Sequence, residues 1–212
     1  HAGPEIGVAS TKAFTGQLAV IMMMAMKIAI EKRSITPEYY KKLLLELQDV
    51  PEKVDAILKN AEELKFIADK YKDASDFLFL GRGYNFPVAL EEISYIHAEG
   101  YPAAEMKHGP IALVTSQLPV VFVATKDSYH EKIVSNMQEI RARKGKIISI
   151  ITDGDTVSPA LSDDWFSIPT ADELIAPILS VVPLQLLSYY SGIAKGIDVD
   201  KPRNLAKSVT VE

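Results

Sequence analysis

Two stretches of this sequence combine residue types that can transfer protons or form covalent bonds. The first, EEISYIHAEGYPAAEMKHGP (residues 91–110), holds several carboxylates and two histidines. Glu92 and His108 are its best general acid–base candidates, because partial burial can tune a carboxylate or an imidazole toward neutral pH. A metal site made of His97, Glu99, Glu105 and His108 is the alternative, but their spacing matches no metal signature, so we predict none.

The second stretch is the carboxyl-terminal run DVDKPRNLAKSVTVE (residues 198–212), in which Lys207 is the candidate nucleophile. A lysine amine attacks a carbonyl group once burial or a neighbouring cation lowers its pKa. Chain ends are ordinarily frayed and replaceable, so the residues alone favour the alternative of a solvated basic tail.

Two further segments have the composition of an anion site. Gly81-Arg82-Gly83 follows the apolar run FLFL, and its backbone N–H groups and arginine can converge on a phosphate. Residues 7–12 precede a predicted helix, whose first N–H groups attract anions. Each segment also has a purely structural explanation, because a strand-to-helix turn needs glycine and Ser10 or Thr11 can cap the helix.

The composition excludes several classes of protein. The 212 residues include 23 Lys and Arg against 28 Asp and Glu, a formal net charge of −5, which leaves no basic surplus for nucleic acid. The sequence has no cysteine, which excludes disulfides, zinc–thiolate sites and thiol catalysis. Since the first residues also lack the pattern of a secretory signal, we expect a cytoplasmic protein.

The most apolar stretch, LAVIMMMAMKIAI (residues 18–30), has 13 residues and contains Lys27. A membrane span needs roughly 20 apolar residues. We therefore expect a buried helix here and no contact with a membrane.

The hydrophobic pattern changes period near residue 72. Before it, spacings of three and four residues predict helices over residues 10–33, 37–48 and 51–71. After it, short continuous apolar runs predict strands at 77–80, 120–124, 147–152 and 165–168, with helices at 128–144 and 171–195, the latter interrupted by Pro177 and Pro183. Alternating strands and helices predict an α/β fold with a doubly wound parallel sheet flanked by helices.

The early helices have no strands of their own to pack upon. We therefore expect residues 1–71 to be the trailing helical part of an incomplete first domain whose sheet lies elsewhere. Residues 72–195 are then a second domain of the same type, and residues 196–212 a tail that carries Lys207.

Several of these segments together resemble one known family. The motifs are EIGVASTKAFT (residues 5–15), FLGRG (79–83), EISYIHAE (92–99), EMKHGP (105–110), EIRAR (139–143), IAPI with VPLQLL (175–178 and 182–187) and the tail. They resemble the C-terminal isomerase part of the glucosamine-6-phosphate synthase family, the glutamine–fructose-6-phosphate aminotransferases (isomerizing). That part consists of two sugar isomerase (SIS) domains.

The resemblance implies a homodimeric enzyme with an SIS-type fold and without metal or organic cofactor. It implies the conversion of fructose 6-phosphate to glucosamine 6-phosphate, with ammonia that a glutaminase domain of the same parent chain releases from glutamine. This is the first step of amino-sugar synthesis.

By motif position, the resemblance also implies the site residues. Lys207 matches the lysine that forms a Schiff base with the open-chain sugar phosphate, and Glu92 matches the glutamate that moves a proton between C1 and C2. His108 matches a histidine that assists ring opening and comes from the neighbouring subunit. Positions that contact the sugar correspond to Val8, Ser10 and Ala206.

Two departures from the family pattern affect activity. The family's phosphate-binding loop precedes the region matched by Glu5, and the family reads ALEGALKLKEISY where this chain reads ALEEISY. Losing six residues from one helix would rotate Glu92 by about 240°, so we expect a stretch missing from the printed sequence rather than a true deletion. We expect this fragment alone to be inactive.

Two other functions stay open. A regulatory SIS module would bind a sugar phosphate without turnover and would need neither Lys207 nor Glu92. A deglycase acting on fructosamine phosphates would share the ligand but not the complete tail motif RNLAKSVTVE.

Overall fold

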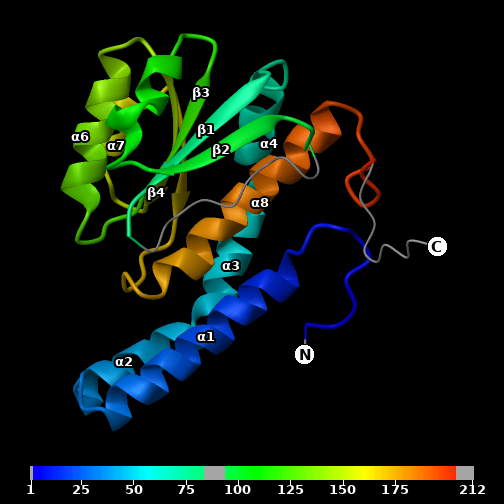
Figure 1. The fold of residues 1–212 in the computed structure, drawn as a ribbon. Coiled ribbons are helices and arrows are strands. Elements are labelled where there is room, and N and C mark those ends of the chain that lie inside the picture. Colours follow the sequence, from blue (N-terminus) through cyan, green and yellow to red (C-terminus); the bar gives the residue numbers. More distant parts are fainter. Residues whose placement is uncertain (1, 84–93, 204–212) are drawn as a thin grey trace.

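The computed structural model describes residues 2–83 and 94–203 and is built around one sheet (Figure 1). The five strands lie in the order β2-β1-β3-β4-β5, and all neighbouring pairs are parallel. They are β1 (Asp76–Gly81), β2 (His97–Pro102), β3 (Pro119–Ala124), β4 (Lys146–Thr152) and β5 (Asp164–Ile168). The predicted α/β fold with a parallel sheet and flanking helices is confirmed.

The four strands predicted from apolar runs are all present. β3 is buried at every position, as expected of a strand covered on both faces. β2, with the sequence HAEGYP, was not predicted, because it contains charged residues, glycine and proline instead of an apolar run. It pairs with β1 alone, and an edge strand tolerates such residues.

Helices cover both faces of the sheet (Figure 1). On one face, α3 (Val50–Lys59), α4 (Ala61–Lys70) and α8 (Ala176–Ala194) join Phe77, Phe79 and Val121 in a buried cluster. On the other face, α6 (His130–Arg141) packs with η1 (Met106–His108) over Leu78 and Phe122. The short elements η2 (Pro110–Leu113) and α7 (Ser158–Leu161) complete this second layer.

α8 is the helix on which the early elements meet. In the most apolar 18-residue stretch of α8, 67% of the residues are buried. The helix packs against α1, α3, α4 and β5. The predicted interruption of this helix is wrong: Pro177 lies in its first turn, where proline is tolerated, and Pro183 lies inside a continuous helix. Pro183 is buried, although it lacks the N–H that an interior helical residue normally donates.

The predicted helix over residues 51–71 is divided in two. Asn60 has backbone angles outside the helical range and separates α3 from α4. The expected apolar face is nonetheless present, since Ile57, Leu64 and Ala68 are buried in the cluster with the sheet. α3 and α4 therefore share a core with β1–β5, and the proposed division at residue 71 stays a prediction.

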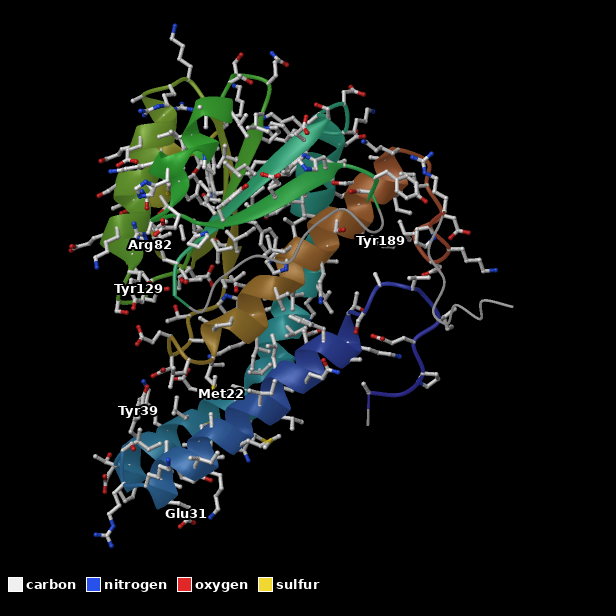
Figure 2. All side chains as sticks on the ribbon, in the orientation of Figure 1. Met22, Glu31, Tyr39, Arg82, Tyr129 and Tyr189 are labelled. Atoms are coloured by element: carbon white, nitrogen blue, oxygen red, sulfur yellow. The ribbon has the colours of Figure 1, made fainter. Side chains whose placement is uncertain are left out.

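α1 (Lys12–Glu31) and α2 (Pro37–Gln48) extend away from the sheet as a pair (Figure 1). A small cluster of Met26, Leu43 and Ile175 joins them to the segment before α8. Met22 packs against this cluster, whereas Glu31 lies at the outer end of the pair (Figure 2).

The expectation of a buried helix over residues 18–30 is wrong. Met26 is the only buried residue of α1, and Ile21 and Met24 are 62% and 60% exposed. The reason is that, among the described elements, only α2 and α8 pack substantially against α1. By length and composition, both α1 and α8 could cross a membrane.

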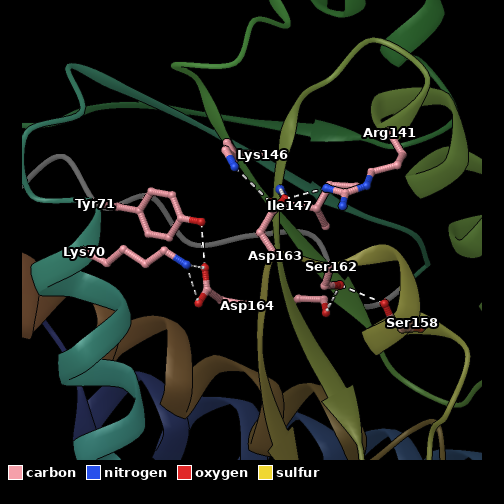
Figure 3. A network of polar contacts seen from close by, with 10 residues as sticks. Lys70, Tyr71, Arg141, Lys146, Ile147, Ser158, Ser162, Asp163 and Asp164 are labelled. Carbon is pink, nitrogen blue, oxygen red and sulfur yellow. Dashed lines mark hydrogen bonds and ion pairs between the residues drawn. The ribbon is translucent and has the colours of Figure 1, made fainter.

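Two adjacent aspartates organise the amino-terminal edge of the sheet (Figure 3). Asp163 accepts hydrogen bonds from Arg141 at 2.8 Å, from the Ile147 N–H at 2.9 Å and from Lys146 at 3.1 Å. Burial alone would raise the pKa of Asp163, but these donors hold it below its usual value.

Asp164 ties α4 to the same edge. It accepts hydrogen bonds from Lys70 and from the Tyr71 hydroxyl, each at 2.7 Å. Burial and this hydrogen bond raise the pKa of Tyr71 well above its usual range, so its hydroxyl stays a donor.

Asp163→Asn is expected to lower the free energy of unfolding by about 2 kcal/mol at neutral pH, because three donors lose a charged acceptor. A carboxyl group whose folded pKa is lowered stabilises the protein above its unfolded pKa, and this contribution is lost as the pH falls. The difference between wild type and variant should therefore shrink below about pH 4 in urea unfolding. The exposed Asp55→Asn is the control and should change stability by less than about 0.5 kcal/mol; a difference independent of pH would contradict the assignment.

Candidate functional site

The two ends of the described chain meet beside α8. The Val8 N–H donates to the Asp200 carbonyl at 3.3 Å. A Cβ added at Gly7 would lie 3.0 Å from Asp200 Oδ1 and 3.7 Å from its Cα, so the two segments are closely packed at this residue. Figure 1 shows the blue N-terminal segment and the red segment after α8 on the same side of the molecule.

A cavity of about 350 Å³ lies at this junction. Its walls come from the N-terminal segment, from Gln185 and Tyr189 of α8 (Figure 2), and from Val199 and Asp200. The Gln185 side-chain amide also donates to the Thr11 carbonyl at 3.4 Å, which holds the first turn of α1 against α8. The volume is within the range of small-ligand sites.

Glu5 occupies the amino terminus of α1. Its Oε1 atom accepts from the N–H groups of Thr11 and Ala13, each at 3.1 Å, and the Ser10 hydroxyl donates to the same oxygen at 3.5 Å. Thr11 occupies the N-cap position, but its side chain makes no capping hydrogen bond. The expected capping by a hydroxyl of Ser10 or Thr11 is therefore wrong, because the Glu5 carboxylate supplies the acceptor. The expected anion site at this helix terminus is filled by the chain's own anion.

The structure brings together some of the predicted site residues. Val8 and Ser10 lie in the segment that contacts the start of the tail, at Asp200. Asp198 fixes that start, since its Oδ1 accepts from the N–H groups of Asp200 and Lys201 at 3.1 Å and 3.2 Å. Glu92, Ala206 and Lys207 lie outside the described residues, so their predicted roles stay predictions.

His108 lies on the other face of the sheet. It ends η1, whose Met106 is fully buried in the cluster beneath α6, and Lys107 bridges to Glu139 of α6 at 2.8 Å. The His108 side chain is 76% exposed, with Nε2 3.8 Å from Glu105 Oε2. Within one chain the sheet thus separates His108 from the junction of the N-terminal segment with the tail.

The other candidate segments have local partners. Arg82 donates from Nε and from a terminal nitrogen to Asn136 Oδ1 of α6, at 3.1 Å and 3.0 Å (Figure 2). Gly83 has φ +59°, and a Cβ there would lie 3.0 Å from the Tyr129 ring. The structural explanation of this turn therefore has direct support.

The alternative metal site of the sequence analysis lies in residues 91–110. His97 Nδ1 lies 3.0 Å from Asp76 and Nε2 lies 3.6 Å from Glu99, at the edge strand. Among residues 2–83 and 94–203, no group of three or more histidine or acidic side chains is arranged to hold a metal ion.

Sequence reasoning missed Glu5 and Asp200 as parts of this junction. The hydrogen bonds that Glu5 accepts span six and eight residues, which is longer than a standard capping motif.

Glu5→Ala is expected to cost about 1 kcal/mol of stability and to accelerate hydrogen exchange at the Thr11 and Ala13 amides, because these donors lose their acceptor. Glu5→Gln keeps an oxygen acceptor and should show the smaller effect.

The matched control is Glu31→Ala, at the exposed far end of α1, where the carboxylate pairs with Lys27 only. It should leave both amides protected. Equal exchange rates in wild type and Glu5→Ala would show that Glu5 does not cap the helix.

Comparisons with known proteins show the family of the chain. The SIS domain family model matches residues 70–194. Glutamine–fructose-6-phosphate aminotransferases (isomerizing) from Bacteroides thetaiotaomicron and Chlorobaculum tepidum are 53% and 56% identical over the whole chain. The chain spans only 36% and 35% of their lengths.

Each of these alignments is 218 positions long and includes all 212 residues of the chain. At least six positions of each relative therefore have no counterpart here. The expectation that a stretch is missing at Glu91-Glu92 stays a prediction.

Solved structures with a similar fold include relatives of the same kind. The C-terminal domain of glucosamine-fructose-6-phosphate aminotransferase from Francisella tularensis has a TM-score of 0.87 and 40% identity, covering 94% of this chain and 58% of that domain. Glucosamine-6-phosphate deaminase from Thermotoga maritima, at 24% identity, has a TM-score of 0.69 over 99% of this chain and 60% of its own, and shows the fold alone. With its parallel sheet, its flanking helices and a family match over more than half its length, the chain belongs to the SIS domain family.

Proposed function

We propose that this chain is the isomerase part of a glutamine–fructose-6-phosphate aminotransferase. The longer protein would convert fructose 6-phosphate and glutamine-derived ammonia to glucosamine 6-phosphate. Similarity along the entire chain to enzymes of that name supports the proposal. Because the chain spans about a third of these relatives, the proposal assigns the glutaminase reaction to another part of a cytoplasmic, homodimeric enzyme.

Lys207 supplies the covalent step in this proposal. Its neutral amine attacks the C2 carbonyl of the open-chain ketose and water leaves, which forms an imine. The protonated imine withdraws electrons and makes the C1–H bond acidic. Ammonia then replaces the lysine at C2, which returns the free amine to the enzyme.

Glu92 and His108 carry the proton transfers. The Glu92 carboxylate accepts a proton from C1 of the protonated, ammonia-derived imine, which gives an enolamine. It returns this proton to C2 while the C1 hydroxyl releases its own proton to solvent, so that an aldose with an amino group at C2 results. His108 assists opening of the sugar ring. Since the sheet lies between His108 and the N-terminal junction, the proposal places this histidine in the site of the neighbouring subunit.

The observation that carries the proposal is the contact between residues 7–8 and Asp200. Val8 and Ser10, with Ala206, are the proposed sugar contacts, and Asp200 is seven residues before Lys207. A tail that begins against Val8 is restricted in the region it can reach, which reduces the entropic cost of bringing amine and sugar together.

In the full-length protein, Lys207→Arg is expected to abolish formation of glucosamine 6-phosphate, by at least about 10³-fold. Arginine keeps the positive charge but cannot condense with a carbonyl. Binding of fructose 6-phosphate, measured by titration calorimetry, should persist, because the amine is not needed to recognise the phosphate.

Lys201→Arg is the matched control, an exposed lysine of the same tail, and should retain activity. Undiminished product formation by Lys207→Arg would refute the imine mechanism. Binding without turnover in the wild-type full-length protein would instead favour a regulatory SIS module.

A further inference from the structure

Tyr95 has a backbone conformation that bulky residues rarely adopt. Its φ is +53°, in the left-handed region, where a residue with a Cβ is sterically disfavoured. The neighbouring residues Ser94 and Ile96 are buried, which anchors the backbone on both sides. Tyr95 itself is half-buried, between these two buried neighbours.

That side chain makes two different contacts with Arg203. The Tyr95 hydroxyl oxygen accepts a hydrogen bond from the backbone N–H of Arg203. The Arg203 guanidinium carbon lies 4.5 Å from the centre of the Tyr95 ring, within the range of a cation–π interaction. One contact fixes the tail's backbone and the other fixes a side chain, so together they restrict both position and rotation.

The tail is also fixed on the other side of Arg203. Pro202 is buried, and the Asp198 carboxylate holds the turn that leads into Lys201. Arg203 is thus the last described residue of a segment with several independent anchors.

Each partner in this contact is close in sequence to a proposed catalytic residue. Tyr95 follows Glu92 by three residues, and Arg203 precedes Lys207 by four. With 3.8 Å between successive Cα atoms, Glu92 is within about 11 Å of Tyr95 and Lys207 within about 15 Å of Arg203, measured between Cα atoms. The contact therefore joins the segments that contain the proposed proton carrier and the proposed nucleophile.

We infer that Tyr95 and Arg203 form a clamp that positions the lysine-bearing tail beside the segment of Glu92, which makes Tyr95 a positioning residue of the reaction. The inference rests on the proposed function. The clamp fixes the start of the tail, at Arg203, against Tyr95, three residues after Glu92. Small displacements of reacting groups reduce rates strongly, so loss of the clamp affects the chemical steps more than sugar binding.

The test uses the full-length protein, fructose 6-phosphate and borohydride, which reduces the imine and leaves the sugar on the lysine. Tyr95→Leu removes the ring and the hydroxyl, and is expected to lower the trapping rate and kcat by about tenfold or more. Tyr95→Phe keeps the ring and should show a smaller loss. Arg203→Ala removes the guanidinium, Arg203→Lys keeps a cation, and only the second should recover most of the rate.

Two matched controls separate positioning from stability. Tyr101→Phe removes a hydroxyl that donates to Glu99 at 2.8 Å on β2, and Lys201→Ala removes a cation from the same tail. Both should trap imine at the wild-type rate. For the clamp variants, KM for fructose 6-phosphate and the melting temperature should stay close to wild type while kcat falls.

The outcomes distinguish the clamp from the function on which it rests. Trapping at Lys207 in the wild type with unchanged rates in Tyr95→Leu and Arg203→Ala would overturn the clamp alone. A lower rate in exact proportion to a lost folded fraction would also overturn it. Absence of any sugar-modified lysine in the wild type would overturn the proposed function.

Discussion

A backbone hydrogen bond between residues 192 positions apart joins the N-terminal segment to the start of the tail. The Val8 N–H and the Asp200 carbonyl form it, and Gly7 packs closely against Asp200. Local hydrogen bonds also fix each segment: Glu5 accepts them at the start of α1, and Asp198 accepts them at the start of the tail. The N-terminal segment and the tail therefore meet as two prearranged elements, which lowers the entropic cost of their contact.

α8 makes that meeting possible. The helix lies on the sheet, with Leu179 and Leu187 buried among β-strand side chains, and its Gln185 and Tyr189 reach the junction. A buried parallel sheet thus fixes the helix, and the helix fixes both segments. His108 is held on the opposite layer by η1 and α6, away from the junction where the tail begins. For this reason the proposed function takes this histidine from a neighbouring subunit.

Continuous apolar runs predicted four of the five strands, because burial on both faces leaves a direct mark on the sequence. β2 left no such mark, since an edge strand with Gly100 and Pro102 pairs mainly through its backbone. The same reasoning failed for α1, where the apolar composition is real but the described chain covers little of it. Motif resemblance predicts Val8 and Ser10 as sugar contacts, and these roles stay predictions. The contacts of Glu5 with α1 and of Tyr95 with Arg203 depend on folding and have no local sequence pattern.

The absence of cysteine from the sequence allows a direct measurement of the junction. In the 212-residue chain, Gly7→Cys combined with Asp200→Cys would place two thiols at a separation that suits a disulfide, since a Cβ at residue 7 lies 3.7 Å from the Cα of residue 200. Under mild oxidation we expect rapid loss of both thiols in the monomeric double variant, with a mass change of about two hydrogens for the single bond formed. Thiols that stay free, or that link only between molecules, would show that the N-terminal segment and the tail do not lie side by side.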